Sequence, residues 1–462
     1  MANEKCDLLI IGAGPGGYAA AIRAGQLGID TIVIDRQPPG GTCLNVGCIP
    51  SKALIHVAND FEKARHFAKD SVIGISASEP KIDLAKTVAW KDGIVKRLNQ
   101  GVSGLMKKAK VRHITGEAEI VDGKTVTVTT DGEQTRIVTK TLLIATGSQP
   151  VALPFLPFDE TVISSTEALS LTKLPKKLVV IGGGYIGLEM GTAFAKLGVQ
   201  TTIVEAAGQL LPQYDAELVA PVAKRLKALG VTIHLNTKAT GADKKGLAVQ
   251  YEDGSADSLP ADKILVTVGR KPAVTGYGLD GLMLDRDGAF IRINEQCATS
   301  MRGVYAIGDV TGEPMLAHRA IAQGEMVAEH ISGIAREWDK RVIPAICFTD
   351  PEIVSAGLSP QEATDQGIEI ITNSFPFLAN SRAMTMEDES GFVRIVARKD
   401  NHLVLGIQAV GGGVAELSAS FGLAIEMGAR LEDIAGTIHA HPTQGEAFQE
   451  AALRTLGHAL HI

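Results

Sequence analysis

The sequence LLIIGAGPGG at residues 8–17 decides the fold of the first part of the chain. The four apolar residues that open it predict a buried strand, and the Ala-rich stretch that follows predicts a helix. Between them, Gly12, Gly14 and Gly17 have the spacing GxGxxG, which permits a tight turn, close approach of a pyrophosphate and close packing of helix on strand. The next predicted strand ends on Asp35, whose carboxylate can accept hydrogen bonds from a ribose.

The same pattern recurs 170 residues later, in LVVIGGGYIG at residues 178–187. Gly182, Gly184 and Gly187 repeat the spacing, and Glu205 again stands 18 residues past the third glycine. One GxGxxG is a weak signal, whereas two copies between predicted strands and helices, each with its acid, predict two dinucleotide sites. The predicted fold class is α/β, with two Rossmann-like dinucleotide-binding domains followed by a C-terminal α+β domain.

Just after the first copy, GGTCLNVGCIPSK at residues 40–52 places Cys43 and Cys48 five positions apart. A disulfide between them would close a small loop that stabilises the fold little, so exchange chemistry is its favoured use. Glycines in this stretch let the backbone approach a flat partner, and Lys52 adds a positive charge within reach. We therefore predict a redox-active disulfide set against a cofactor. The other three cysteines are scattered, which favours a reducing cytoplasmic compartment over a secreted disulfide framework.

The cofactors follow from what surrounds each glycine turn. The first turn leads into the cysteine pair, and a flavin can mediate between a disulfide and a nicotinamide, which delivers hydride. We therefore predict FAD at the first turn and a nicotinamide dinucleotide at the second. Glu205 would repel a 2′-phosphate, and no Lys or Arg follows it before Lys224, so NAD is favoured over NADP.

Composition limits the classes of function. The 462 residues are 45% hydrophobic and 21% charged, as in a soluble globular protein of two to four domains. The net charge of −7 leaves no basic footprint for nucleic acid or for an anionic membrane. No run approaches about 18 apolar residues, and the N-terminus lacks the pattern of a signal peptide. We expect a cytoplasmic protein with no nucleic-acid or membrane partner.

A second candidate site lies in TIHAHPTQGE at residues 437–446. Thiol–disulfide exchange requires a thiolate, and an imidazole can take the proton of a substrate thiol while a carboxylate orients that imidazole. His441 with Glu446 would form such a dyad. The alternatives are a His-x-His metal pair and two structural histidines. No further ligand cluster is evident nearby, so no metal is predicted, and His439 is assigned a structural role.

Together these residues resemble the pyridine nucleotide–disulfide oxidoreductases, and most closely the members that oxidise dihydrolipoamide. The resemblance covers essentially the whole chain and rests on GGTCLNVGCIPSK at 40–52, GGGYIGLE at 182–189, YAIGDV at 305–310 and HAHPTQGE at 439–446. It implies four segments: an FAD-binding domain at 1–149, an NAD-binding domain at 150–274, a central segment at 275–344 that completes the FAD domain, and an interface domain at 345–462. The interface domain would form a homodimer.

The resemblance also implies roles for single residues. Cys48 would face the flavin and form the charge-transfer thiolate, and Cys43 would exchange with the substrate. Lys52 would lie near the flavin and pair with Glu189, while His441 would act on the disulfide of the other subunit. The positions implied to bind FAD are Gly12, Gly14, Gly17, Asp35, Gly41, Thr42, Lys52, Gly116, Ala145, Thr146, Gly147, Asp309, Met315, Leu316, Ala317 and His318. Those implied to bind NAD are Gly182, Gly184, Tyr185, Gly187, Glu189, Glu205 and Gly269.

The implied activity is oxidation of protein-bound dihydrolipoamide to lipoamide with reduction of NAD+ to NADH. The implied partner is the lipoyl domain of a 2-oxoacid dehydrogenase complex, with a hint toward the branched-chain type, or a glycine-cleavage lipoyl protein. Two positions depart from the family pattern. Gln444-Gly445 stands where members often have Leu-Ser, and Tyr185 is typical of glutathione reductases, although those enzymes tend to have alanine where this chain has Gly187. A glutathione-reducing enzyme and a non-catalytic nucleotide-binding scaffold are the alternatives.

Overall fold

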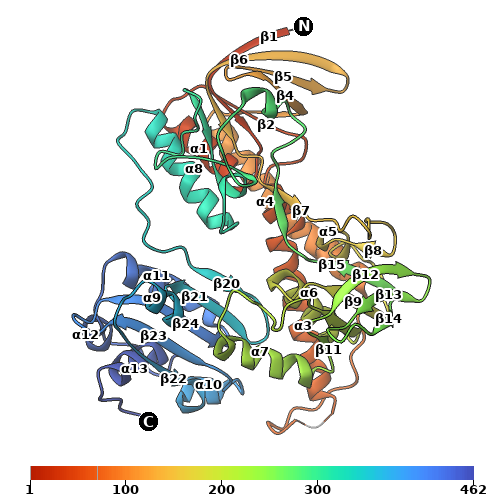
Figure 1. The fold of residues 1–462 in the computed structure, drawn as a ribbon, viewed down its shortest axis with the longest axis vertical. Helices are drawn as coiled ribbons and strands as arrows, with labels where there is room; N and C mark the ends of the chain where they lie inside the picture. The colour runs from red at the N-terminus through yellow and green to blue at the C-terminus, as the bar shows by residue number, and fades with distance from the viewer. Residues whose placement is uncertain (1, 70) are drawn as a thin grey trace.

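The computed structural model describes residues 2–69 and 71–462, and these form three lobes (Figure 1). The first lobe contains a seven-stranded sheet with the order β3-β2-β1-β6-β5-β4, in which β19 also pairs with β6. Its strands are β1 (Ala2–Ile11), β2 (Thr31–Asp35), β3 (Arg112–Thr115), β4 (Glu117–Asp122), β5 (Thr125–Thr130), β6 (Glu133–Ile144) and β19 (Val304–Ala306). β1 runs parallel to β2 and β6, and Leu8, Leu9 and Ile10 are completely buried, as expected for a central strand covered on both faces.

Helices α1 (Pro15–Gln26) and α8 (Ala317–Ile331) lie side by side in this lobe (Figure 1). They approach closely because small residues meet at the contact, where a Cβ on Gly16 would lie 2.9 Å from the Ala320 carbonyl oxygen. Both β19 and α8 belong to a part of the chain that follows the second lobe. The first lobe is therefore completed by a segment distant in sequence.

Three helices follow β2: α2 (Gly41–Val46) and α3 (Cys48–Phe67), which carry the cysteine motif, and α4 (Leu84–Lys108). Asp83 caps α4 by accepting a hydrogen bond from the Lys86 amide at 3.2 Å. Leu54 of α3 belongs to the same buried core as Leu188, which lies on α6 (Tyr185–Lys196) of the second lobe. This packing sets the start of α3, and with it Cys48, between the two lobes.

The second lobe has a parallel five-stranded sheet with the order β11-β10-β9-β15-β8 and an antiparallel three-stranded sheet, β12-β13-β14. A short antiparallel pair, β7 with β16, lies where the chain enters and leaves this lobe. The elements are β7 (Ser148–Pro150), β8 (Val162–Ile163), α5 (Ser165–Ala168), β9 (Lys177–Ile181), α6, β10 (Gln200–Val204), α7 (Ala216–Ala228), β11 (Thr232–His234), β12 (Lys238–Asp243), β13 (Gly246–Gln250), β14 (Ala256–Pro260), β15 (Lys263–Val266) and β16 (Arg270–Pro272).

The third lobe is an antiparallel five-stranded sheet with the order β20-β21-β24-β23-β22, covered by helices. Its core contains Phe375, Phe377, Phe421 and Phe448. The elements are β20 (Ala345–Cys347), β21 (Glu352–Gly357), α9 (Pro360–Asp365), β22 (Ile370–Pro376), α10 (Ser381–Thr385), β23 (Phe392–Arg398), β24 (Val404–Gly411), α11 (Ser418–Glu426), α12 (Leu431–Gly436) and α13 (Glu446–Thr455). Figure 1 shows α13 close to the C-terminus of this lobe.

The remaining elements are short: β17 (Arg286–Asp287), β18 (Phe290–Ile291) and the 3-10 turns η1 (Leu279–Leu282), η2 (Gly308–Thr311), η3 (Phe377–Ala379) and η4 (Val414–Leu417). The predicted fold class, two Rossmann-like units followed by an α+β unit, is confirmed. The predicted domain boundaries stay a prediction. Among the residues described, no helix is both long and apolar enough to cross a membrane.

Candidate active site

The two glycine turns have the same geometry. Gly12 has φ = 101° and Gly182 has φ = 103°, a region in which a side chain is strained. A Cβ on Gly12 would also collide with the Ala145 carbonyl oxygen, and a Cβ on Gly182 would lie 2.6 Å from that of Thr267. Both positions therefore require glycine for the same two reasons.

The acid that follows each turn is tied back to it. Asp35 Oδ2 accepts a hydrogen bond from the Ala13 amide at 2.7 Å, and Glu205 Oε2 accepts one from the Gly183 amide at 2.6 Å. The two donors, Ala13 and Gly183, are 170 positions apart in the sequence, and so are the two acceptors, Asp35 and Glu205. Each carboxylate is thus held at the end of its strand, beside the turn.

A cavity in the first lobe collects most positions predicted to bind FAD. It is lined by Gly12, Gly14, Asp35, Gly41, Thr42, Lys52, Ala145, Thr146, Gly147, Asp309, Met315 and Ala317, together with both cysteines of the pair. Four predicted positions do not line it. Gly17 packs on the Gly12 carbonyl, the Gly116 amide donates to the Asp35 carbonyl at 3.0 Å, Leu316 lines a second cavity, and His318 Nε2 lies 2.8 Å from the Pro344 carbonyl oxygen.

The first cavity suits a dinucleotide with a flat ring. Its floor is bare backbone, because a Cβ on Gly41 would lie 2.6 Å from the Cα of Gly14. The N-terminus of α1 lines the cavity beside Asp35. Its free amide groups favour phosphates, and the Asp35 carboxylate favours a ribose. Asp309 accepts a hydrogen bond from the Ser148 hydroxyl at 2.5 Å and offers a further acceptor inside the cavity.

The cysteine pair lies where α2 gives way to α3. Both sulfurs are free thiols here, as in the reduced form of the pair. A hydrogen bond from Cys43 lowers the pKa of Cys48 to about 7; burial opposes this shift and the nearby Lys52 charge adds to it. The same hydrogen bond, with burial, raises the pKa of Cys43. Of the two thiols, Cys48 is therefore the one whose ionisation these surroundings favour.

Lys52 pairs with a carboxylate from the second lobe. Its Nζ lies 2.7 Å from Oε2 of Glu189, whose residue is 3% exposed, and 4.6 Å from the ring centroid of Phe348. The other oxygen of Glu189 accepts a hydrogen bond from the Phe348 amide at 2.9 Å. Glu189, predicted to contact both sites, thus lies on the first cavity and not on the second.

A second cavity, of about 900 Å³, lies at the second glycine turn. Gly182, Gly184, Tyr185, Glu205 and Gly269 line it, as predicted for the NAD site, whereas Gly187 is covered by the Gly182 carbonyl. Tyr185 and Met315 line both cavities. The two predicted cofactor sites are therefore neighbours, with Tyr185 at their junction.

Arg270, Tyr214 and Lys238 are among the lining residues that the sequence did not predict. Arg270 lines both cavities, and its Nε donates to the Ser148 hydroxyl at 2.8 Å, whereas only its neighbour Gly269 was predicted. Tyr214 and Lys238 line the second cavity. Lys238 is a cation 33 positions after Glu205. No local sequence pattern connects it to the glycine turn, so its place in the cavity could not be predicted.

The predicted dyad is present in the third lobe. His441 Nδ1 lies 2.7 Å from Glu446 Oε1, and Glu446 Oε2 accepts a hydrogen bond from the Thr443 amide at 2.7 Å. Burial opposes ionisation of Glu446, but these two hydrogen bonds hold its pKa below the ordinary value. Gly445, which departs from the family pattern, has ordinary helical angles and directly precedes α13.

Within one chain the dyad and the cysteines are not brought together. His441 is absent from the lining of the cavity that contains Cys43, and its side chain is 72% exposed. Within the described residues, 2–69 and 71–462, no group of three or more His, Cys, Asp or Glu side chains is arranged to hold a metal ion. The arrangement can therefore perform disulfide exchange at the cavity, but its base must come from elsewhere.

Comparison with known proteins defines the class. Residues 6–324 match the family model described as pyridine nucleotide-disulphide oxidoreductase, and residues 343–452 match the dimerisation domain of the same family. The chain belongs to the pyridine nucleotide-disulphide oxidoreductases. It is an enzyme of this family, which uses FAD and NAD(H), so the predicted family and cofactors are confirmed.

Among its relatives are dihydrolipoyl dehydrogenases. The one from Pseudomonas aeruginosa is 59% identical over 459 residues, which cover 99% of each chain, and the one from Geobacillus stearothermophilus is 45% identical over 463 residues, with 99% and 98% covered. Among solved structures, LpdA from Mycobacterium tuberculosis superposes with a TM-score of 0.89 at 27% identity, covering 98% of this chain and 99% of that one. The HOCl-induced flavoprotein disulfide reductase RclA from Escherichia coli, solved as a Cu(II) complex, has a TM-score of 0.86 at 25% identity, with 97% and 99% covered.

Proposed function

We propose that this chain oxidises protein-bound dihydrolipoamide to lipoamide and reduces NAD+ to NADH, with Cys43 and Cys48 as the exchanging pair. Dihydrolipoyl dehydrogenase activity, predicted from the sequence, is confirmed by relatives that share 59% and 45% of its residues over almost the whole chain. The observation that carries the residue assignment is the lowered pKa of Cys48 beside Lys52, in a cavity adjoining both glycine turns. That asymmetry divides the pair into one sulfur for the substrate and one for the flavin.

The exchange step transfers two electrons from the substrate dithiol to the disulfide of Cys43 and Cys48. His441 of the partner subunit, oriented by its Glu446, takes a proton from one substrate thiol, and the thiolate attacks Cys43 of the oxidised pair. The Cys43–Cys48 bond breaks and Cys48 leaves as a thiolate. The second substrate thiol then loses its proton and attacks the substrate sulfur bound to Cys43. Cys43 leaves and takes up that proton, so that lipoamide closes and two electrons remain on the cysteines.

The cavities would hold the two cofactors around this pair. FAD, when bound, supplies the two-electron transfer that connects a thiolate with a nicotinamide. Gly12, Gly14 and Asp35 would hold its pyrophosphate and ribose, and Lys52 with Glu189 would fix the charge beside its reacting end. The second turn and Glu205 would hold NAD+ in the same way. Tyr185, at the junction, would separate the two cofactors until the nicotinamide enters.

The match to the family's dimerisation domain supports a homodimer. We propose further that the enzyme is cytoplasmic and that its partner is the lipoyl domain of a 2-oxoacid dehydrogenase complex or a glycine-cleavage lipoyl protein. The exposed His441 side chain supports a base that completes its site only in the dimer.

The test compares two disulfide substrates with two coenzymes. Lipoamide with NADH should turn over, whereas efficient reduction of glutathione disulfide with NADPH would establish the alternative that Tyr185 favours. Cys43→Ser should abolish lipoamide turnover, and Cys6→Ser, at a buried position outside both cavities, is the matched control. If Cys43→Ser keeps its lipoamide activity, the exchange role of Cys43 is wrong.

A further inference from the structure

The loop at residues 206–215, which follows Glu205, forms part of the wall of the second cavity. Its residues Ala206, Pro212, Gln213 and Tyr214 line that cavity. Leu211 is completely buried, and its amide donates to the Gly183 carbonyl at 2.9 Å. One side of the loop is therefore attached to the glycine turn itself.

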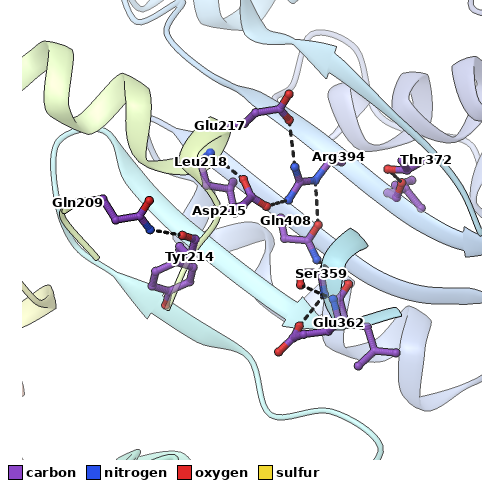
Figure 2. Close-up of polar contacts among 12 residues, drawn as sticks. Gln209, Tyr214, Asp215, Glu217, Leu218, Ser359, Glu362, Thr372, Arg394 and Gln408 are labelled. Carbon is purple, nitrogen blue, oxygen red and sulfur yellow. Dashed lines mark hydrogen bonds and ion pairs between the residues drawn. The ribbon is translucent and has the colours of Figure 1, made fainter. Parts of the chain in front are cut away.

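The other side of the loop is attached to the third lobe. Asp215 ends the loop and caps α7, because its Oδ1 accepts a hydrogen bond from the Leu218 amide at 3.1 Å. Its Oδ2 forms an ion pair with Arg394 of β23, and Figure 2 shows the guanidinium reaching Asp215 from the neighbouring sheet. Arg394 is only 5% exposed. A buried cation thus joins the coenzyme lobe to the dimerisation domain.

Arg394 is itself held firmly. Its Nε donates to Gln408 Oε1 at 3.1 Å, and its Nη1 lies 3.1 Å from Glu217 Oε2 (Figure 2). Gln408 is completely buried on β24 and donates onward to the Leu358 carbonyl at 2.9 Å. A guanidinium with this many fixed partners transmits the position of the third lobe's sheet to Asp215.

Tyr214, next to Asp215, lines the second cavity, so a change at the Asp215–Arg394 ion pair would reach the cavity through Tyr214. Its carbonyl accepts a hydrogen bond from Gln209 Nε2 at 3.0 Å, which closes the loop on itself (Figure 2). Its hydroxyl lies 3.5 Å from the thiol of Cys347, at the end of β20 in the third lobe. Loss of the ion pair at Asp215 would free the backbone that places this ring.

We propose that Arg394 is a positioning residue for coenzyme binding, because through Asp215 it fixes the loop at residues 206–215 that shapes the NAD site. The inference rests on the proposed function, since it takes the second cavity as the NAD site. It makes the dimerisation domain a determinant of coenzyme affinity, without contact between Arg394 and the coenzyme.

The test is Arg394→Met, with Arg394→Lys as the conservative variant. We expect the KM for NAD+ and the Kd for NAD+ from titration calorimetry to rise about tenfold in the methionine variant, with kcat within about twofold. Reduction of the protein by dihydrolipoamide without NAD+ should keep its rate. The lysine variant, which keeps one charge contact, should recover most of the affinity. Arg398→Met is the matched control, because Arg398 lies on the same strand but pairs with exposed Asp400.

Asp215→Asn provides a second variant that preserves an acceptor for the Leu218 amide while removing the charge. It should raise the Kd for NAD+ in the same direction. Unchanged NAD+ affinity in both variants overturns the inference, and so does an equal loss in the half-reaction without NAD+, which reports a general structural defect. Wild-type protein that fails to bind NAD+ at all would instead overturn the assignment of the second cavity. The two failures are therefore distinguishable.

Discussion

Replacing Glu446 with glutamine tests whether the dyad acts in catalysis. The carboxylate accepts two hydrogen bonds, one from His441 Nδ1 and one from the Thr443 amide, both at 2.7 Å. A glutamine amide has one oxygen and one NH2 group, so it can satisfy only one of these donors and turns a donor toward the other. The substitution therefore loses either the orientation of the imidazole or the anchor of the loop before α13.

The magnitude follows from these contacts. A charge-assisted hydrogen bond contributes about 1.5–3 kcal/mol and a neutral one about 0.5–1.5 kcal/mol, so the replacement should cost about 1–2 kcal/mol where the imidazolium forms. That corresponds to a loss of about 5- to 30-fold in the dithiol step, at about 1.4 kcal/mol per factor of ten. Electron transfer from NADH to an artificial acceptor does not need the dyad and should stay within about twofold.

The assay measures lipoamide turnover and diaphorase activity on the same preparation. Glu450→Gln is the matched control, because Glu450 lies one turn further along α13 and has the same two kinds of partner, His461 Nδ1 at 2.6 Å and the Leu460 amide at 3.1 Å, although its side chain is more deeply buried. If both variants lose lipoamide activity equally, or if Glu446→Gln lowers both activities alike, the loss is structural and the role of the dyad is refuted.

The pH dependence of stability provides an independent check on Glu446. Its folded-state pKa is lowered from 4.5, so the carboxylate stabilises the fold at pH values above the unfolded pKa. This stabilisation is lost as the pH falls through the folded pKa. Unfolding of Glu446→Gln in acid should therefore lose part of the pH dependence that the unmodified chain shows, and identical acid profiles would contradict the lowered pKa.

Three further predictions use other contacts. The long-wavelength absorbance of the two-electron-reduced holoenzyme should persist at pH values below the ordinary thiol pKa of about 8.5, because the hydrogen bond from Cys43 lowers the pKa of Cys48; a band that disappears as the pH falls through about 8.5 would contradict it. Gly182→Ala places a Cβ 2.6 Å from the Thr267 carbonyl oxygen, so NAD+ reduction measured by stopped flow should slow about tenfold or more while reduction by dihydrolipoamide continues, and equal slowing would speak against two separate sites. Lys196→Met removes a buried cation that pairs with Asp350 and Glu62, both of which keep Arg225 as a partner, so its urea midpoint should fall by the equivalent of about 2 kcal/mol, against little change in exposed Lys399→Met; equal midpoints would show that the Lys196 pairs are not coupled to stability.

The features that the sequence predicted correctly are those carried by short patterns. The two strand–turn–helix units could be predicted because Gly12 and Gly182 require a positive φ and have no room for a Cβ. Only glycine meets both requirements, and it appears in a short motif that can be recognised locally. The α+β character of the third lobe was predicted as well, and its antiparallel sheet covered by helices agrees. The Cys43–Cys48 spacing predicted a reactive pair, and the lowered pKa of Cys48 beside the raised pKa of Cys43 supports the proposed division of their roles.

The contacts that the sequence could not predict join distant segments. Arg394 meets Asp215 from 179 positions away, and Lys52 meets Glu189 from 137 positions away. Lys52 and Glu189 each lie within a family motif, so the resemblance implied their pairing, whereas no such motif includes Arg394 or Asp215. The resemblance placed His318 at the flavin, and this stays a prediction; its ring lies 2.8 Å from the Pro344 carbonyl oxygen, a contact between residues 26 positions apart that the sequence also did not predict.

The two halves of the repeat differ where their loops leave the acid. In each copy the loop returns to its glycine turn through one backbone hydrogen bond, from Gly40 to Ala13 at 2.7 Å in the first and from Leu211 to Gly183 at 2.9 Å in the second. The first loop then runs directly into the helices that carry the cysteines. The second runs into the Asp215–Arg394 pair and the third lobe. The same framework therefore supports reactive sulfur in one copy and an attachment between domains in the other, which is why the repeat predicts both dinucleotide sites but neither of these functions.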